Sequence, residues 1–238
     1  MNPLFEQKKV VIAGGTSGIG LAAAQLLIAQ KANVTITGRN AAKLELAKQQ
    51  TGTSGKILDS SDRAQVDAFF REQGKIDHLI IALSGSKGGG VFAELPLQDL
   101  RDGFEGKFWP QLNTLQAAIP YMNAGGSITL ITAISAVAKL PGFSGLTAIN
   151  GALELMVPVL AKELMPLRIN AVSPGVTDTP WWDFLPADAK QEAFAQYATQ
   201  IPVGMVARPE VVAEAVLFAA GNINTTGTII RCDGGLSS

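Results

Sequence analysis

The stretch that decides the fold is residues 9–20, which read Lys9-Val10-Val11-Ile12-Ala13-Gly14-Gly15-Thr16-Ser17-Gly18-Ile19-Gly20. The first five residues have the length and β-branched content of a buried strand, and the apolar run after Gly20 is typical of a helix. Glycines between a strand and a helix allow a tight turn and a close backbone approach to a ligand. The free N–H groups of the helix start favour phosphate oxygens. The motif predicts a phosphate cradle; the alternative is a structural turn without a ligand.

Short β-branched runs continue to alternate with longer segments of helical period along the rest of the chain. This pattern is typical of repeated βαβ units and a parallel sheet. Several runs, such as residues 79–83, are apolar throughout, as expected when helices cover both faces. We predict an α/β fold, a doubly wound parallel Rossmann sheet of about seven strands with helices on both faces. The predicted strands are Lys9–Ala13, Asn33–Gly38, Gly55–Asp59, Ile76–Leu83, Ser127–Thr132, Arg168–Ser173 and Thr228–Cys232.

Length and charge limit the classes of partner. The chain has 238 residues, 47% of them hydrophobic, and a formal net charge of -1. We expect one dinucleotide-binding domain over residues 1–238, with a small molecule or further copies of the chain as partners, and neither nucleic acid nor a membrane. The single cysteine, Cys232, cannot form an internal disulfide, which favours a cytoplasmic protein without a metal site.

The end of the second predicted strand indicates which dinucleotide binds. A Rossmann site for NAD usually has an acidic residue there, which bonds the ribose 2′-hydroxyl, whereas a 2′-phosphate needs a cation. No Asp or Glu lies between Glu6 and Glu45, and Arg39 follows the strand with Lys43 one turn later. A guanidinium binds phosphate through paired hydrogen bonds, so NADP is favoured. The alternative is an ordinary exposed arginine.

These motifs and three others resemble the short-chain dehydrogenase/reductase family over nearly the whole chain. Gly14 to Gly20 is similar to its glycine motif, Asp59 to its acidic residue after the third strand, residues 168–180 to its segment after the sixth strand, and 233–235 to its ending. The resemblance implies the following cofactor-binding residues: Gly14, Thr16, Ser17, Gly18 and Ile19 at the phosphates; Arg39, Asp59 and Ser60 at the adenosine; Ala82, Ser84 and Gly85 after the fourth strand; and Pro174, Gly175, Val176, Thr177 and Thr179 near the nicotinamide.

The family's catalytic positions hold other residues. The family uses a Tyr as general acid/base, a Lys four residues later, a Ser that orients the substrate and an Asn on the helix after strand four. Ungapped counting places the Ser position on Ala133, the Tyr position on Leu146 and the Lys position on Asn150, while the Asn position falls on Lys107. Leu146 and Ala133 cannot transfer a proton. The resemblance therefore implies a divergent member.

The exchange of Lys and Asn between two neighbouring positions suggests a relocated cation. We predict that Lys107 and Asn150 form the catalytic pair, with Lys107 extending above the cofactor ribose and bonded to Asn150 or to a water between them. The alternative is a lysine that points to solvent or forms a salt bridge. The hydroxyls of Ser135, Ser144 and Thr147 are poor acids without an activating base. Tyr121 lies too far along its helix, Tyr197 belongs to the helix after the expected substrate lid, and the only histidine, His78, is expected to be structural.

Aromatic residues gather in the segments that the resemblance places around the crevice: Phe108, Trp109, Phe143, Trp181, Trp182 and Phe184. They indicate an apolar pocket, although lid and core packing is the alternative. Two functions follow from the sequence: an NADP(H)-dependent oxidoreductase acting on an apolar carbonyl or alcohol by a non-standard proton path, or a non-catalytic NADP(H)-binding sensor or partner protein. The helix predicted over Leu146–Leu164 is apolar around much of its circumference, which favours a homodimer or homotetramer.

Overall fold

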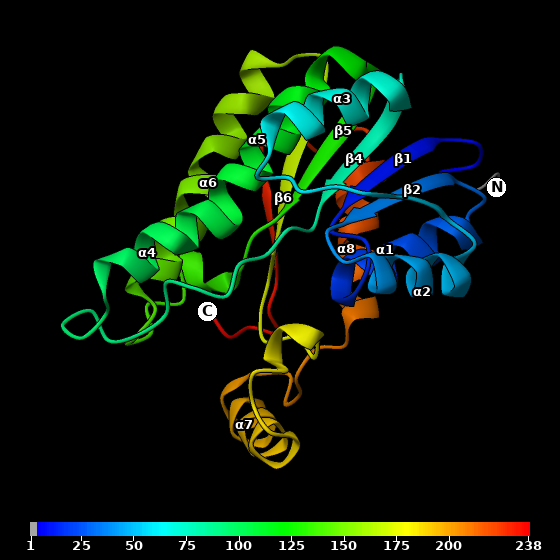
Figure 1. Cartoon of the computed structure of the whole chain (residues 1–238). Helices are drawn as coiled ribbons and strands as arrows, with labels where there is room; N and C mark the ends of the chain where they lie inside the picture. Colours follow the sequence, from blue (N-terminus) through cyan, green and yellow to red (C-terminus); the bar gives the residue numbers. More distant parts are fainter. Residues whose placement is uncertain (1–3) are drawn as a thin grey trace.

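One parallel sheet runs through the part of the chain that the computed structural model describes, residues 4–238 (Figure 1). Each strand pairs in parallel with its neighbours, and the spatial order is β3 (Ser54–Ile57), β2 (Asn33–Gly38), β1 (Lys9–Ala13), β4 (Ile76–Ile81), β5 (Met122–Ile131), β6 (Arg168–Pro174) and β7 (Ile229–Cys232). The doubly wound Rossmann fold predicted from the sequence is confirmed.

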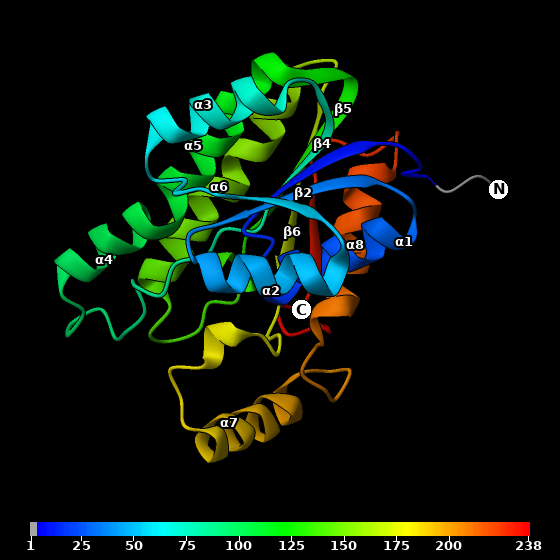
Figure 2. The ribbon, with the colours of Figure 1, turned by 45° about the vertical axis from the view of Figure 1, so that its right-hand side comes forward.

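Helices cover both faces of this sheet (Figures 1 and 2). One apolar core, which includes Ile12, Leu27 and Val212, joins the sheet to α1 (Gly18–Ala29), α2 (Ala41–Thr51) and α8 (Pro209–Gly221). A second core, which includes Phe70 and Leu153, joins the other face to α3 (Arg63–Gln73), α5 (Trp109–Ala118) and α6 (Ser144–Glu163). Full burial of one such side chain stabilises the fold by about 1.5–3 kcal/mol, so these two cores hold the three layers together.

Several element ends differ from the predicted ones. Strand β3 lies at Ser54–Ile57 instead of 55–59, because Asp59 turns away to accept hydrogen bonds from Ser61. Strand β4 ends at Ile81 instead of Leu83, and β5 begins at Met122 instead of Ser127, since Met122 already pairs with Ile76. Strand β6 extends by one residue, β7 is shorter by one, and α6 occupies 144–163 instead of 146–164.

A π-helical turn over Phe104–Phe108 interrupts the helical run between α4 (Leu97–Gly103) and α5. Pro110 has no N–H, and its ring clashes with the carbonyl four residues earlier in a regular α-helix. The turn just before it is wider, and the Trp109 N–H donates to the carbonyl of Phe104, five residues back. Such a bulge changes the direction in which its side chains project. In this chain the bulge contains Lys107, which is buried.

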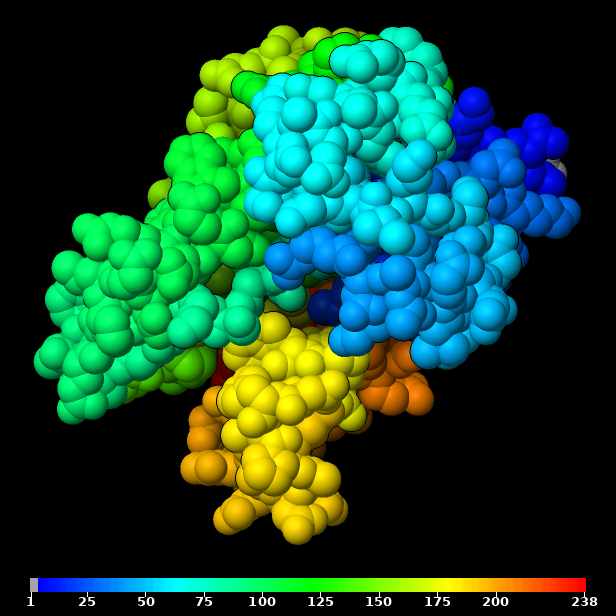
Figure 3. Space-filling view, viewed as in Figure 1, coloured from blue at the N-terminus to red at the C-terminus, as the bar shows by residue number. Residues whose placement is uncertain are grey.

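A cleft opens where the strand order reverses, between β1 and β4. Chain connections leave these two strands in opposite directions, so their carboxyl ends border a crevice. Helix α7 (Ala187–Gln200), which follows a short 3₁₀ turn at Pro180–Trp182, lies outside the layers and has no buried residue. The space-filling view shows a recess between this lobe and the segments near α2 and α4 (Figure 3).

Helix α6 has an unusual composition for a helix packed on a sheet. By length and composition alone it could cross a membrane. Its Ile149, Leu153 and Val157 are buried in the structure, whereas Leu155 is 78% exposed and Val159 is 52% exposed. The core therefore explains why the inner face of α6 is apolar, but it does not explain the exposed apolar side chains on the outer face.

Arg168 at the start of β6 supports the end of α8, and we expect Arg168→Met to destabilise the fold. Its guanidinium donates to the carbonyls of Ala219, Ala220 and Asn222, which the helix end leaves without intrahelical donors. Loss of these bonds should lower the free energy of unfolding by about 1–3 kcal/mol, measured by urea denaturation. The exposed Arg71 of α3 provides the control, since Arg71→Met should cost little. Equal effects of the two substitutions would contradict this role.

Candidate functional site

The glycine loop forms a cradle at the base of the cleft. Gly14 and Gly18 have φ angles of +83° and +54°, which side-chain-bearing residues rarely adopt. A Cβ on Gly14 would lie 2.6 Å from the carbonyl oxygen of Ala82 on the neighbouring chain segment. Ser17 precedes α1 without a capping hydrogen bond from its side chain, so the first N–H groups of that helix remain available for an anion.

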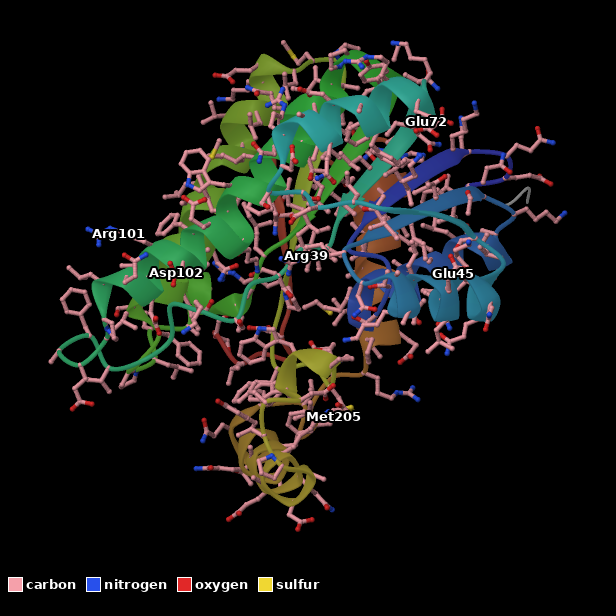
Figure 4. The ribbon with its side chains drawn as sticks, in the orientation of Figure 1. Arg39, Glu45, Glu72, Arg101, Asp102 and Met205 are labelled. Atoms are coloured by element: carbon pink, nitrogen blue, oxygen red, sulfur yellow. The ribbon has the colours of Figure 1, made fainter. Side chains whose placement is uncertain are left out.

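The adenosine end of the cleft combines a cation with an unpaired hydroxyl. Arg39 is exposed at the end of β2, and Figure 4 shows it beside the recess, whereas Arg101 extends outward from α4. Hydrogen bonds from Ser61, and then the Arg39 charge, hold the pKa of Asp59 below its usual value. The Ser60 Oγ is buried without a protein partner. A cradle that a Cβ would fill, an orphaned hydroxyl and a cation fit a dinucleotide with a 2′-phosphate.

The opposite end of the cleft is built by β4, β6 and the turn before α7. Ala82 donates from its backbone N–H to Ala13, 2.7 Å away, which fixes the chain as it leaves β4. The Trp181 indole N–H donates to the Gly85 carbonyl at 2.9 Å, and the Trp182 indole N–H donates to the Thr177 carbonyl at 3.1 Å. These two bonds attach the segment leading to α7 to the rim of the cleft.

One cavity of about 950 Å³ brings together the residues proposed from the sequence. The lining includes the predicted cofactor positions Gly14, Thr16, Ser17, Gly18, Ile19, Arg39, Asp59, Ser60, Ala82, Ser84, Gly85, Pro174, Gly175, Val176, Thr177 and Thr179, and the predicted catalytic positions Lys107 and Asn150. Their individual roles stay predictions. Their convergence on one surface is what a dinucleotide site with a reactive end requires.

Lys107 lies at the floor of this cavity. Its Nζ donates to the carbonyl oxygen of Thr132, which directly follows β5, at 3.1 Å. Only 9% of the residue is exposed. Burial lowers the pKa of its ammonium to about 8, and the negative charge of Glu154 acts in the opposite direction. One of the three N–H donors is used by Thr132, which leaves the others for a bound molecule.

The sequence predicts two arrangements for Lys107 and Asn150, a direct hydrogen bond or a water between them. The direct bond is absent from the described residues, and the water-mediated contact stays a prediction. The Asn150 Nδ2 donates instead to the Ser135 Oγ at 3.1 Å and to the Leu146 carbonyl at 3.0 Å. Its Oδ1 is buried and has no protein partner. The Lys107 Nζ instead bonds the Thr132 carbonyl and lies in the field of the Glu154 charge, while the Asn150 amide bonds a carbonyl of its own helix. Both groups still border the same cavity.

Ala133 and Leu146, which the sequence predicts at the family's Ser and Tyr positions, line the cavity as apolar surface. Ser135 and Tyr197 also reach it, but Ser144, Thr147 and Tyr121 are not part of its lining. His78 is buried elsewhere, where it shares a 2.8 Å hydrogen bond with Ser127, and burial lowers its pKa to about 4. A structural role for this histidine agrees with the prediction.

The aromatic residues divide between the cavity and other surfaces. Phe143, Trp181 and Trp182 line the cavity, whereas Phe108, Trp109 and Phe184 do not. Trp109 is 47% exposed, and Phe184 packs on both tryptophans from outside. The apolar wall is completed by Leu140, Leu146 and Ile149. Thus the predicted apolar pocket exists, but only half of the predicted aromatics form it.

The sequence reasoning missed two residues beneath the site, Thr132 and Glu154. Glu154 is buried, and its Oε1 accepts hydrogen bonds from the hydroxyls of Thr132 and Ser173, each at 2.7 Å. The available signal was an acidic residue inside the apolar run Leu153-Glu154-Leu155-Met156, one helical turn after Asn150. A lone charge within an apolar helix segment is rarely buried unless it has partners.

Comparisons with known proteins agree with this geometry. A family model described as enoyl-(acyl carrier protein) reductase matches residues 13–237. A 3-oxoacyl-(acyl-carrier-protein) reductase from Thermotoga maritima is 30% identical over 98% of both chains. A solved small-chain dehydrogenase in complex with NADPH is 33% identical, with a TM-score of 0.86 over 98% of this chain and 99% of the other.

A further solved structure shares the fold. This short-chain oxidoreductase from Pseudomonas aeruginosa, described as containing an atypical catalytic center, is 27% identical, with a TM-score of 0.88 over 98% of both chains. The match over residues 13–237 and these relatives of nearly full length show that this chain belongs to the short-chain dehydrogenase/reductase family, a family of oxidoreductases.

Proposed function

We propose that the chain interconverts an apolar carbonyl compound and its alcohol, with Lys107 supplying the proton that a tyrosine supplies elsewhere in the family. The observation that carries this proposal is the buried Lys107 ammonium at the floor of a cavity whose Ser and Tyr positions are Ala133 and Leu146. No other ionisable group is buried in that lining. An acid is needed at this place because a carbonyl that accepts hydride becomes an alkoxide.

The cofactor is NADP(H). NADPH is bound in the solved relative that is 33% identical to this chain, and here the glycine loop, the unpaired Ser60 hydroxyl and Arg39 line a cavity suited to it. When bound, the cofactor supplies or accepts the hydride at its nicotinamide ring. The residues of the chain that would hold it are the start of α1 at the phosphates, Arg39 at the 2′-phosphate, and the backbone around Gly175 at the other end.

Lys107 is suited to proton transfer because its ordinary pKa is lowered by burial to about 8. An ammonium with this pKa is a stronger acid than a phenol, whose pKa is about 10. It is still mostly protonated at neutral pH, so it favours the direction of reduction. Asn150 offers an unpaired acceptor, Oδ1, to a hydroxyl of the bound molecules.

The apolar wall of the cavity limits the substrate to compounds with little charge near the reacting carbon. Leu146, Ile149, Phe143 and the two tryptophans Trp181 and Trp182 surround that end of the cleft. Burying apolar groups of a substrate against such a wall favours binding, whereas a charged substituent there would lose its hydration. The substrate oxygen then takes the place beside the Lys107 ammonium.

Lys107→Met tests the proposed proton path. It removes the acid but keeps the length of the side chain, so carbonyl-dependent oxidation of NADPH should fall by about 10²–10⁴-fold. The exposed Arg71→Met is the control and should retain activity. Unchanged turnover in Lys107→Met contradicts the proposal, and NADPH binding without turnover on any carbonyl favours the non-catalytic sensor.

The pH dependence of reduction should follow the same ammonium. The rate is proportional to its protonated fraction, so it should be constant below pH 8 and fall tenfold per unit above about pH 8. The rate of the reverse oxidation should rise over the same range. A rate of reduction that stays level up to pH 10 would show that another group donates the proton.

Arg39→Ala tests how the cofactor is selected. Charge-assisted hydrogen bonds to the 2′-phosphate contribute about 1.5–3 kcal/mol, so the variant should lose a tenfold or greater preference for NADPH over NADH. Calorimetric titration with each cofactor measures this. The affinity for NADH should change little, and equal affinities in the unmodified protein would contradict the assignment.

We also propose that the chain is a cytoplasmic homodimer or homotetramer that pairs through the outer face of α6. Leu155 and Val159 lie one helical turn apart on this face and are largely exposed. Exposed apolar surface of this kind usually marks an interface.

Leu155→Glu should therefore reduce the molar mass that light scattering measures, because a charge at the centre of the interface remains unpaired. Glu163→Gln, at the exposed end of the same helix, should leave the mass unchanged. A monomer mass for the unmodified chain at micromolar concentration would rule the assembly out.

A further inference from the structure

Glu154 is a buried carboxylate for which the proposed reaction gives no role. It lies on α6, is 8% exposed and accepts hydrogen bonds from the hydroxyls of Thr132 and Ser173. Both hydrogen bonds are accepted by the same carboxylate oxygen, Oε1. A buried negative charge is nevertheless costly unless a positive charge lies near it.

Lys107 provides that positive charge, and Thr132 links the two groups. The Thr132 carbonyl accepts from the Lys107 Nζ at 3.1 Å, while its hydroxyl donates to the Glu154 Oε1 at 2.7 Å. Within residues 4–238 the Lys107 ammonium and the Glu154 carboxylate form no direct ion pair. Thr132, which directly follows β5, lies between them. The charges therefore act on each other through low-dielectric protein, where attraction is stronger than in water.

Other charged groups around Lys107 are further into solvent. Helix α5 and strand β5 carry no charged side chain, and α6 carries only Lys162 and Glu163 besides Glu154, both exposed. Water and salt screen the charges on α4, on the π-helical turn and at the cleft rim, where Lys87 already pairs with Asp99. These solvent-facing groups are Lys87, Asp99, Arg101, Asp102 and Glu105. Glu154 is thus the charge that acts most directly on Lys107.

We propose that Glu154 is a positioning residue whose buried charge keeps Lys107 an ammonium at the floor of the cleft, with Thr132 fixing the spacing between them. Burial lowers the pKa of Lys107 to about 8, and the carboxylate limits this fall. Without Glu154 the lysine would lose its proton at a lower pH. The inference rests on the proposed function in one respect: it explains how the proton donor stays charged at neutral pH.

The pH dependence of stability tests this coupling without any substrate. The folded pKa of Lys107, about 8, lies below its ordinary value of 10.5, so between these values the unfolded chain binds more protons. Stability from this group therefore rises as pH increases through that window. The free energy of unfolding, measured in urea from pH 6 to 10.5, should show this rise in the unmodified protein, and Lys107→Met should remove it.

Glu154→Gln keeps an acceptor for Thr132 and Ser173 but removes the charge. The rise in stability should then begin at least about one pH unit lower, because a nearby opposite charge shifts a pKa by that amount or more. In the control Glu163→Gln, which changes an exposed residue of the same helix, the rise in stability should begin at the same pH as in the unmodified chain. An identical onset in Glu154→Gln and the unmodified chain would overturn the proposal.

Should Glu154→Gln fail to fold, the double variant with Lys107→Met should fold, because it no longer buries an uncompensated charge. Persistent failure of that double variant would also overturn the proposal. The pH profile of NADPH oxidation gives a separate readout: its fall at high pH should move to lower pH in Glu154→Gln and stay in place in Glu154→Asp. If Lys107→Met leaves turnover intact, the proposed function fails, and the stability experiment still decides whether the two charges are coupled.

Discussion

The site depends on the close approach of two chain segments at the carboxyl ends of β1 and β4. Ala82 donates a 2.7 Å hydrogen bond to Ala13, and Gly14 lies so near Ala82 that a side chain would not fit. These strands are neighbours in the sheet, and the connections that follow them leave in opposite directions. The crevice between those connections receives the glycine loop on one side and the π-helical turn on the other.

In the function that we propose, the proton donor lies on the π-helical turn and not on α6. A tyrosine at the position of Leu146 would place a phenol in the cavity. Leu146 makes that part of the cavity surface apolar instead. Lys107 approaches from beneath, where burial adjusts its pKa and the backbone of Thr132 holds its Nζ. The bulge next to Pro110 lets one residue of an otherwise regular helical run occupy this position.

The segment that carries Trp181 and Trp182 connects the end of the cleft opposite Arg39 with the α7 lobe. Both indole N–H groups bond backbone carbonyls of the cleft rim, while their rings face the cavity and pack on Phe184 and Tyr197. Helix α7 has no buried residue of its own. It packs on Trp182 through Phe194 and Tyr197, and its Lys190 also pairs with Asp178.

The sequence by itself determined the α/β class, the order of strands and helices, and the surface that the cofactor motifs share. Glycine spacing, β-branched runs and the missing acidic residue near Arg39 act through local backbone geometry and charge, which the sequence displays directly. Strand ends were less certain, because Met122 and Asp59 take positions set by partners on other strands and turns.

Only the tertiary structure decided which groups meet at the floor of the cleft. Lys107 and Thr132 are 25 residues apart in the sequence, Thr132 and Glu154 are 22 apart, and no spacing rule links them. The sequence placed Lys107 near Asn150, yet the amide is held by Ser135 and Leu146, and the ammonium turns to Thr132. The reason is physical: a buried charge settles where carbonyl oxygens and an opposite charge stabilise it, and those groups come together only when the sheet is assembled.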